Sequence, residues 1–255
     1  MKVRLVSSIA VVCCLICPWQ LLAAEDETPR KSAKPQARSV SPDGKWELRA
    51  GAHEDDDFVI AKAGSNETSV VLSEEEYVDG FAEAMGRAPV YANIVWAADS
   101  KRFAFNFQPS KGFQAAQFYQ LDGDQWRKLD APESHDAMSA TLDRSLINQK
   151  KKVKEKWKLS ADDWGWPVMT SWQVRKWVDP GTVLLYARRS AKFDVKGGTE
   201  EVNASFFFTL TFDDAGNWKV TRRAEVPATG VSGMDAEERK EINRIENEDR
   251  EVRGK

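Results

Sequence analysis

The sequence predicts a mainly β protein, built of antiparallel blade-like sheets or a twisted sandwich, with one central helix and a charged C-terminal helical tail. Three observations lead to this fold class. Short runs rich in β-branched and aromatic residues recur along the chain, and turn-forming residues separate them. The gaps between these runs suit hairpins rather than the long crossovers of a parallel sheet. A single internal stretch has the apolar period of a helix.

Residues 1–24 are typical of a secretory signal peptide. A lysine and an arginine precede the apolar run Leu5–Cys17, and Ala23 and Ala24 are small enough for the peptidase, which leaves cleavage after either one open. The alternative is an uncleaved membrane anchor. The apolar run is shorter than the roughly 20 residues that cross a bilayer, so the signal peptide is favoured. We therefore expect an exported protein, periplasmic or extracellular.

Composition narrows the classes of partner. All three cysteines lie in the leader, so the exported chain has no disulfide, no thiolate nucleophile and no cysteine metal site. The full chain has 37 basic and 40 acidic residues, and removing Lys2 and Arg4 leaves 35 against 40, a net charge of −5. This acidity argues against nucleic acid as the main partner. No later segment is apolar and long enough to span a membrane, so we expect no integral membrane segment after cleavage.

A polar segment with two prolines, residues 25–38, is predicted to be a disordered spacer before the folded part. The β domain is predicted to cover residues 39–227. Its strand-like runs are Asp57–Ala63, Glu67–Ser73, Lys101–Phe107, Gln114–Asp122, Ser171–Val178, Thr182–Ser190 and Ser205–Asp213.

The central helix is predicted within Thr141–Ser160. Leu142, Leu146, Val153 and Trp157 fall on one helical face, although the last part of the segment also fits a short strand. We favour a helix that ends near Lys156.

The tail, residues 228–255, is almost entirely charged from Asp235 onward. Its opposite charges often lie three or four residues apart, which supports a solvated helix. The apolar stripe is thin, so we expect a helical or disordered tail that keeps the protein soluble and docks weakly or not at all.

One turn phrase occurs three times. DGKWELRA from Asp43, DGDQWRKLDA from Asp122 and DAGNWKVTRRA from Asp214 each place an acidic residue and a glycine before a tryptophan. Glycine supplies the positive φ of a tight turn, and the aromatic side chain can cover that turn. In a second phrase, at Trp96 and Trp177, a tryptophan ends one strand, an aspartate-containing turn follows, and an apolar strand returns.

SPDGKW and WAADSKRFAF resemble the turn-and-strand phrase of TolB-like and WD-type β-propeller repeats. In that family each blade is a small antiparallel sheet. The resemblance covers about three irregular units between Val40 and Pro227, whereas propellers have about 4–8 blades. It therefore implies an open, incomplete propeller-like assembly rather than a closed ring.

Five tryptophans gather in one region: Trp157, Trp164, Trp166, Trp172 and Trp177. Large aromatics in a domain without disulfides are mainly expected in the core, but flat indole faces also bind sugars or peptides. Trp164 and Trp166 are the expected exceptions, because they lie in a loop that contains glycine and proline, beside Asp162 and Asp163. These four residues are the candidate ligand-binding site.

Motifs for chemistry are weak. Asp55, Asp56 and Asp57 could help to hold calcium, but the alternating pattern and the glycine of a calcium loop are missing, so a solvated connection is favoured. The two histidines, His53 and His135, form no helical metal motif, and no glycine-rich phosphate loop is present. We predict no cofactor and no catalytic residue.

The sequence thus favours a non-catalytic binding or scaffolding module of the cell envelope, with an envelope protein or a glycan as partner. Two alternatives stay open: a carboxylate-dependent glycan hydrolase and a purely structural domain. Strand edges are compatible with self-association, because unpaired backbone groups invite another chain.

Overall fold

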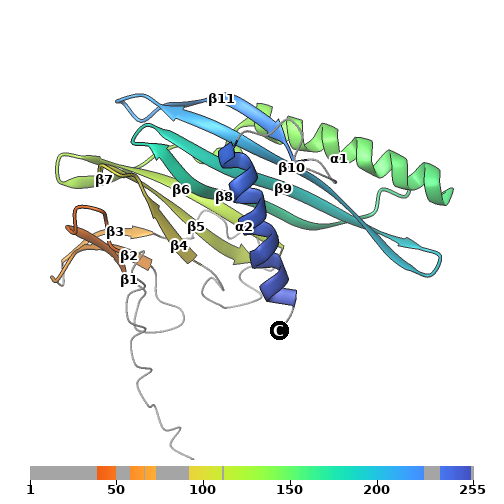
Figure 1. The fold of residues 1–255 in the computed structure, drawn as a ribbon, viewed down its shortest axis with the longest axis horizontal. Coiled ribbons are helices and arrows are strands. Elements are labelled where there is room, and N and C mark those ends of the chain that lie inside the picture. Colours follow the sequence, from red (N-terminus) through yellow and green to blue (C-terminus); the bar gives the residue numbers. More distant parts are fainter. Residues whose placement is uncertain are drawn as a thin grey trace, which may run out of the picture. The chain divides into compact units, whose positions relative to one another are not determined.

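The computed structural model describes residues 39–49, 58–65, 67–72, 92–110, 112–226 and 236–253. The mainly β fold class is confirmed in these residues (Figure 1). The predicted signal peptide, the spacer, the acidic residues Asp55, Asp56 and Asp57, and residues 228–235 of the tail lie outside them. No helix in the described ranges is both long and apolar enough to cross a membrane.

Two sheets make up the β structure. The smaller sheet has the order β1-β2-β3, and its strands are Trp46–Arg49, Phe58–Lys62 and Thr68–Leu72. The larger sheet has the order β11-β10-β9-β8-β6-β5-β4, and β7 also pairs with β6. Its strands are β4 (Ala92–Trp96), β5 (Arg102–Ser110), β6 (Phe113–Asp122), β7 (Gln125–Lys128), β8 (Trp166–Asp179), β9 (Thr182–Val195), β10 (Gly198–Phe212) and β11 (Trp218–Glu225).

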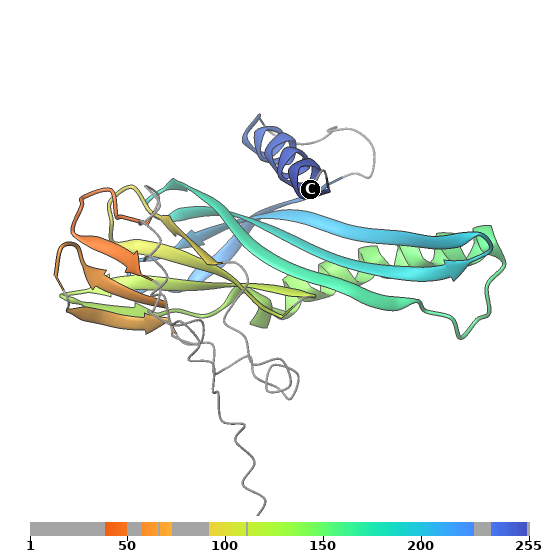
Figure 2. The ribbon, with the colours of Figure 1, turned by 90° about the horizontal axis from the view of Figure 1, so that it is seen from below.

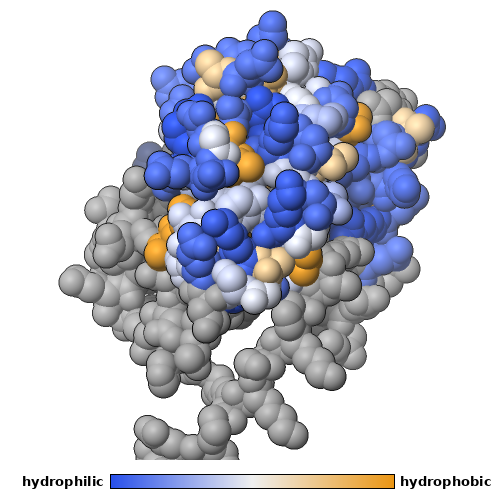
Figure 3. Space-filling model, turned by 90° about the vertical axis from the view of Figure 1, so that its left-hand side faces the viewer, coloured by the Kyte–Doolittle hydropathy of each residue, from blue (hydrophilic) through white to orange (hydrophobic). Residues whose placement is uncertain are grey.

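The first half of the β structure is an antiparallel meander, β4 to β7, with the small sheet packed against it. Trp46, Ile60 and Leu72 of the small sheet share one buried cluster with Phe103 and Phe105 of β5. The described residues at this end, on the left in Figure 1, present a mainly hydrophilic surface with scattered hydrophobic residues (Figure 3). The aromatic residues that the sequence supplies here are therefore mostly used for packing.

The second half consists of long antiparallel strands, β8 to β11, with a helix on each face. Phe206 and Phe208 of β10 pack with Leu142 of α1 (Asp136–Trp157), whereas Phe207 packs with Ile242 of α2 (Ala236–Arg253). This alternation follows from the two-residue period of a strand. Figure 2 shows the two helices on opposite sides of these strands.

The central helix α1 ends where the sequence predicts, one residue after Lys156, but it begins at Asp136, five residues before Thr141. The 3-10 helix η2 (Pro132–Ser134) precedes it. Lys158 ends the helix in the left-handed conformation, with φ of 53°. The crossover through η2 and α1 makes β6 and β8 parallel, which is the one exception to the predicted antiparallel pairing in the described sheets.

The repeated turns have the predicted backbone. Gly44, Gly123 and Gly216 all have positive φ, between 61° and 86°. Trp46 and Trp126 are buried and meet edge to face, with ring centroids 5.5 Å apart. The hairpins predicted from these phrases are thus confirmed. The described sheets are open, and a relation to propeller repeats stays a prediction.

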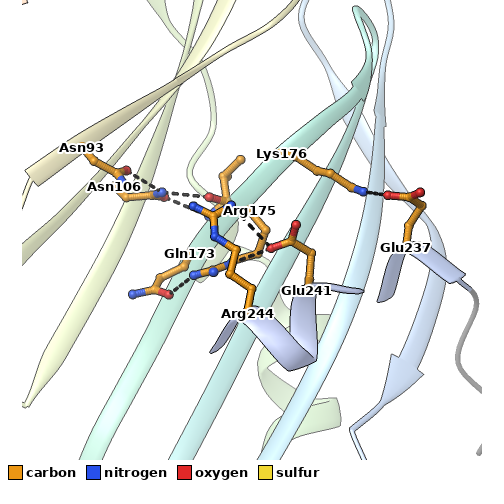
Figure 4. Close-up of polar contacts among 9 residues, drawn as sticks. Asn93, Asn106, Gln173, Arg175, Lys176, Glu237, Glu241 and Arg244 are labelled. Atoms are coloured by element: carbon orange, nitrogen blue, oxygen red, sulfur yellow. Dashed lines mark hydrogen bonds and ion pairs between the residues drawn. The ribbon is translucent and has the colours of Figure 1, made fainter. Parts of the chain in front are cut away.

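The two halves meet where β8 leaves β6. The β6–β8 pairing covers only Phe113 with Thr170 and Gln114 with Ser171. Beyond this pairing, the side-chain amide of the buried Asn106 on β5 forms hydrogen bonds with both the N–H and the C=O of Val174. Its Oδ1 accepts from the Val174 N–H at 2.8 Å, and its Nδ2 donates to the Val174 carbonyl at 2.8 Å (Figure 4). One side chain thus replaces a missing strand contact.

Further side chains fasten the halves to each other through backbone carbonyls. The Trp177 indole N–H donates to Val95 O at 2.9 Å, and the Trp218 indole N–H donates to Asp130 O at 2.9 Å. Arg102 Nη2 donates to Asp213 O at 2.7 Å. Hydrogen bonds from the Asn217 side chain and from the turn backbone to the Asp213 carboxyl close the turn that contains this residue. The same hydrogen bonds hold the pKa of the Asp213 carboxyl below its usual value.

Helix α2 docks on the sheet through two apolar side chains, Ile242 and Ile245, and through several ionic contacts. Ile242 is buried, Arg175 Nε lies 3.3 Å from Glu241 Oε2, and Lys176 pairs with Glu237 (Figure 4). Glu238 is 1% exposed and accepts two hydrogen bonds from Arg222, both of 3.0 Å. The prediction of weak or no docking is therefore corrected. It failed because, in a charged tail, the sequence pattern does not distinguish carboxylates that dock from carboxylates that stay solvated.

We predict that Asn106→Ala destabilises the fold strongly. The substitution leaves the buried N–H and C=O of Val174 without this partner, at about 1–3 kcal/mol for each group, or about 2–6 kcal/mol in total. Urea unfolding followed by circular dichroism measures the loss. Asn148→Ala is the matched control, because Asn148 is exposed on α1 and its side chain makes no hydrogen bond among the described residues, and a change within about 0.5 kcal/mol is expected there. Equal effects of the two substitutions would contradict the proposed bridge.

We predict that Glu241→Ala loosens α2 far more than Glu237→Ala. The Arg175 and Glu241 side chains are only 9% and 6% exposed, so breaking this pair costs about 3 kcal/mol. The Lys176–Glu237 pair is more exposed and is worth less than about 1 kcal/mol. Hydrogen exchange of the α2 amides is the measurement. The ranking of the two pairs is wrong if Glu237→Ala accelerates exchange as much as Glu241→Ala does.

Candidate functional site

Two tryptophans stand apart from the others. Trp164 is 46% exposed and Trp166 is 42% exposed, and they are the tryptophans that reach this level among the described residues. Trp172, from the same sequence region, is fully buried, and Trp157 and Trp177 are half-buried. We call Asp162–Trp166, together with Lys154, the Trp164–Trp166 surface. The structure thus separates the aromatic residues into core and surface, which the sequence left open.

A glycine holds this surface in place. Gly165 lies between the two tryptophans with φ of +63°, a conformation that favours glycine. A Cβ atom at this position would lie 2.5 Å from the Lys192 carbonyl oxygen and 3.2 Å from the Phe193 ring. The loop therefore rests directly on β9, and only a residue without a side chain allows this approach. Figure 2 shows the connection from α1 to β8 beside the β9–β10 hairpin.

The C-terminal end of α1 fixes the other side of the loop. The Trp157 indole N–H donates to Glu200 of β10, and Lys156 Nζ lies 3.0 Å from the same carboxylate. The Trp157 hydrogen bond, followed by the contacts with Lys156, keeps the pKa of Glu200 below its usual value. A carboxyl group in this state suits structural pairing rather than proton donation at neutral pH.

The ammonium group of a lysine lies over the Trp164 ring. Lys154 Nζ lies 4.1 Å from the ring centroid, within the range of a cation–π contact. Lys154 therefore covers one face of the indole. A ligand that stacks on Trp164 has the opposite face and the ring edge available, while Trp166 has no ring or cation contact of this kind among the described residues.

The two predicted aspartates have different surroundings. Asp162 is exposed, whereas Asp163 is half-buried and its Oδ1 accepts from the Gly165 N–H at 3.0 Å. Asp163 thus shapes the turn that presents the tryptophans. No group of three or more metal-ligating side chains gathers in the described ranges, and the weak metal candidates Asp55, Asp56 and Asp57 lie outside them.

The structure also has a groove, away from the Trp164–Trp166 surface, that was not predicted from the sequence. A groove of about 520 Å³ runs between the start of α1 and β11, and we call it the α1–β11 groove. Its lining includes His135, Met138, Phe208, Lys219 and Arg223. The only sequence signal was the basic strand sequence WKVTRRAE. Nothing in the sequence showed that residues 135–141 would lie against it, because the two segments are about 80 residues apart and meet only through tertiary packing.

Comparisons with protein-family models, curated proteins and solved structures find no match for this chain. The class that the fold and the surfaces define is therefore an open, mainly β domain with a fixed, solvent-exposed pair of tryptophans.

We predict that Gly165→Ala disturbs the Trp164–Trp166 surface. The substitution should lower the free energy of unfolding by more than the usual cost of placing a non-glycine residue in the left-handed conformation. That cost is about 1–2 kcal/mol, and the contact with the Lys192 carbonyl adds about 1–3 kcal/mol. Gly123→Ala is a close control, since its φ is +61° and a Cβ there meets nothing within 4 Å. Thermal unfolding gives the stability difference, and near-ultraviolet circular dichroism reports on the tryptophans. Identical values for the two variants would show that the close approach is not tight.

Proposed function

We propose that this protein is a non-catalytic binding module of the cell envelope, and that the Trp164–Trp166 surface receives its partner, an envelope protein or a glycan. The observation that carries the proposal is the exposure of both indoles in a chain that otherwise buries or half-buries the tryptophans of its described residues. Tryptophan is enriched among the residues that dominate binding energy at interfaces, and flat indoles also stack on sugar rings.

The surface is well suited to binding because it is held in place before a partner arrives. Gly165 rests on the Lys192 carbonyl, Asp163 closes the turn, and Lys154 contacts the Trp164 ring. A side chain that is already ordered loses less conformational entropy on binding, so more of the contact energy becomes affinity. A flexible loop with the same tryptophans would not have this advantage.

The carboxylates around this surface support a binding role rather than hydrolysis. A glycosidase acid needs a raised pKa, and its two carboxyl groups must face each other across the substrate. Asp163 is engaged with the Gly165 N–H, and the pKa of Glu200 is lowered. These groups therefore stabilise the loop and its support.

The proposal places the protein outside the cytoplasm, on the basis of the features of residues 1–24. The recurring turn phrases are part of the same proposal. We interpret them as units related to propeller repeats that here form open sheets and act as a scaffold for the exposed loop.

We predict that Trp164→Ala combined with Trp166→Ala abolishes partner retention and leaves the fold intact. The two residues are 46% and 42% exposed and belong to no buried core cluster of the described residues, so the unfolding midpoint should change little, whereas binding should weaken by about tenfold or more. The measurement is retention of envelope extract components and of cell-wall glycan fragments on the immobilised protein.

The matched control for this experiment is Val71→Ala combined with Val178→Ala. These valines are also exposed, at 47% and 55%, and lie on β3 and at the end of β8. The control should retain the same partners as the unmodified protein. If the tryptophan variant retains every component that the control retains, the Trp164–Trp166 surface is not the binding site.

A further inference from the structure

We propose that the α1–β11 groove is a second ligand site, for a small amphiphilic carboxylate, that is, an apolar chain with a single carboxylate head of the fatty-acid type. This inference does not depend on the Trp164–Trp166 surface. It rests on the shape of the groove, the charge of its lining and a buried polar atom without a partner.

The floor of the groove is apolar. Met138 of α1 and Phe208 of β10 are both 1% exposed, and Val220 of β11 packs against the same buried cluster. The volume of about 520 Å³ is within the range of about 300–1,000 Å³ that is typical of small-molecule sites. An alkyl chain would therefore meet packed hydrocarbon rather than water along this floor.

The charged residues that line the groove are all basic. Arg222 is engaged by Glu238, whereas Arg223 has no carboxylate partner among the described residues. Lys219 pairs with Thr211 and alternates along β11 with Val220, so its side chain faces away from the apolar floor. Arg223 Nη1 makes one long hydrogen bond, of 3.5 Å, to Thr141 Oγ1. A cation without a carboxylate partner beside an apolar floor is complementary to an anion that carries an apolar chain.

A β-bulge produces this arrangement. The register between β10 and β11 shifts between Thr209 and Leu210, so that Leu210 pairs with Val220 and Thr209 pairs with Arg222. The extra residue, Thr221, changes which side the following residues face. Arg223 consequently reaches Thr141 of α1, while Arg222 reaches Glu238 of α2. In an unbroken strand, Val220 and Arg222 would share a face instead.

His135 supplies an unused polar atom in the same place. It precedes α1, lines the groove and stacks on Trp218, with ring centroids 5.1 Å apart. Its buried Nδ1 has no hydrogen-bond partner within the described structure. Buried ring nitrogens are normally satisfied, so this atom marks a polar position beside the groove that no protein group of the described residues uses.

The same features disfavour an extended peptide on the free edge of β11. Adding a strand requires a regular row of backbone groups, and the bulge at Thr221 interrupts that row. Basic side chains and bulges are also the features by which proteins protect sheet edges from strand addition. A compact ligand inside the groove avoids both obstacles.

The test is calorimetric titration of the full chain with decanoate, kept below its micelle concentration. We expect saturable binding of one decanoate per protein. Arg223→Gln should weaken it by about ten- to hundredfold, because it removes a charge-assisted contact. Lys151→Gln is the matched control, since Lys151 is an exposed lysine on α1 outside the groove lining, and it should bind like the unmodified protein.

Two further probes define the head group. Decanol, which has the same chain without the charge, should bind at least tenfold more weakly than decanoate. Decyl phosphate should not bind more tightly than decanoate. The variant with Trp164→Ala and Trp166→Ala should bind decanoate normally, which distinguishes failure of this proposal from failure of the binding function proposed above.

Several results would overturn the proposal. The proposal is wrong if decanoate shows no saturable binding, if the Arg223→Gln and Lys151→Gln variants bind decanoate with equal affinity, or if the protein binds decanol as tightly as decanoate. Tighter binding of decyl phosphate would assign the groove to phosphate amphiphiles and would overturn the carboxylate assignment.

Discussion

Where β8 separates from β6, the amide of Asn106 bonds to both backbone groups of Val174 and so takes the place of a neighbouring strand. The larger sheet depends on this contact, because the parallel pairing beside it covers only two residue pairs. Asn93 and Gln114 extend the same polar connection on either side. Such a bridge ties the two halves of the larger sheet together at one point and lets each continue in its own direction.

This separation explains where the candidate sites lie. Once β8 has left β6, the strands β8 to β11 extend as the second half of the larger sheet, which α1 covers on one face and α2 on the other (Figure 2). The Trp164–Trp166 surface lies where the chain enters this half, and the α1–β11 groove lies at its outer strand. Both sites are therefore at margins of this half of the sheet, where a connection or an edge leaves side chains accessible.

The two sites use different physical means. At the Trp164–Trp166 surface, a close backbone approach at Gly165 fixes large apolar rings in solvent, so affinity would come from contact area and low entropic cost. In the α1–β11 groove, a bulge directs Arg223 toward α1, where no carboxylate of the described residues pairs with it, so selectivity would come from charge. The ion pairs of α2, in contrast, serve to hold a helix on the sheet.

The local structure could be predicted from the amino-acid sequence: the mainly β class, the hairpins at Gly44, Gly123 and Gly216, and the end of α1 near Lys156. These features depend on neighbouring residues, through turn conformation, strand alternation and helical period. The sequence also singled out Trp164 and Trp166 as the exceptions to burial in their region. Only the packing of the whole chain showed that β6 and β8 are parallel, that α2 docks through buried carboxylates, and that His135 and Arg223 share a groove. Those outcomes depend on contacts between residues far apart in the chain, which no local pattern encodes.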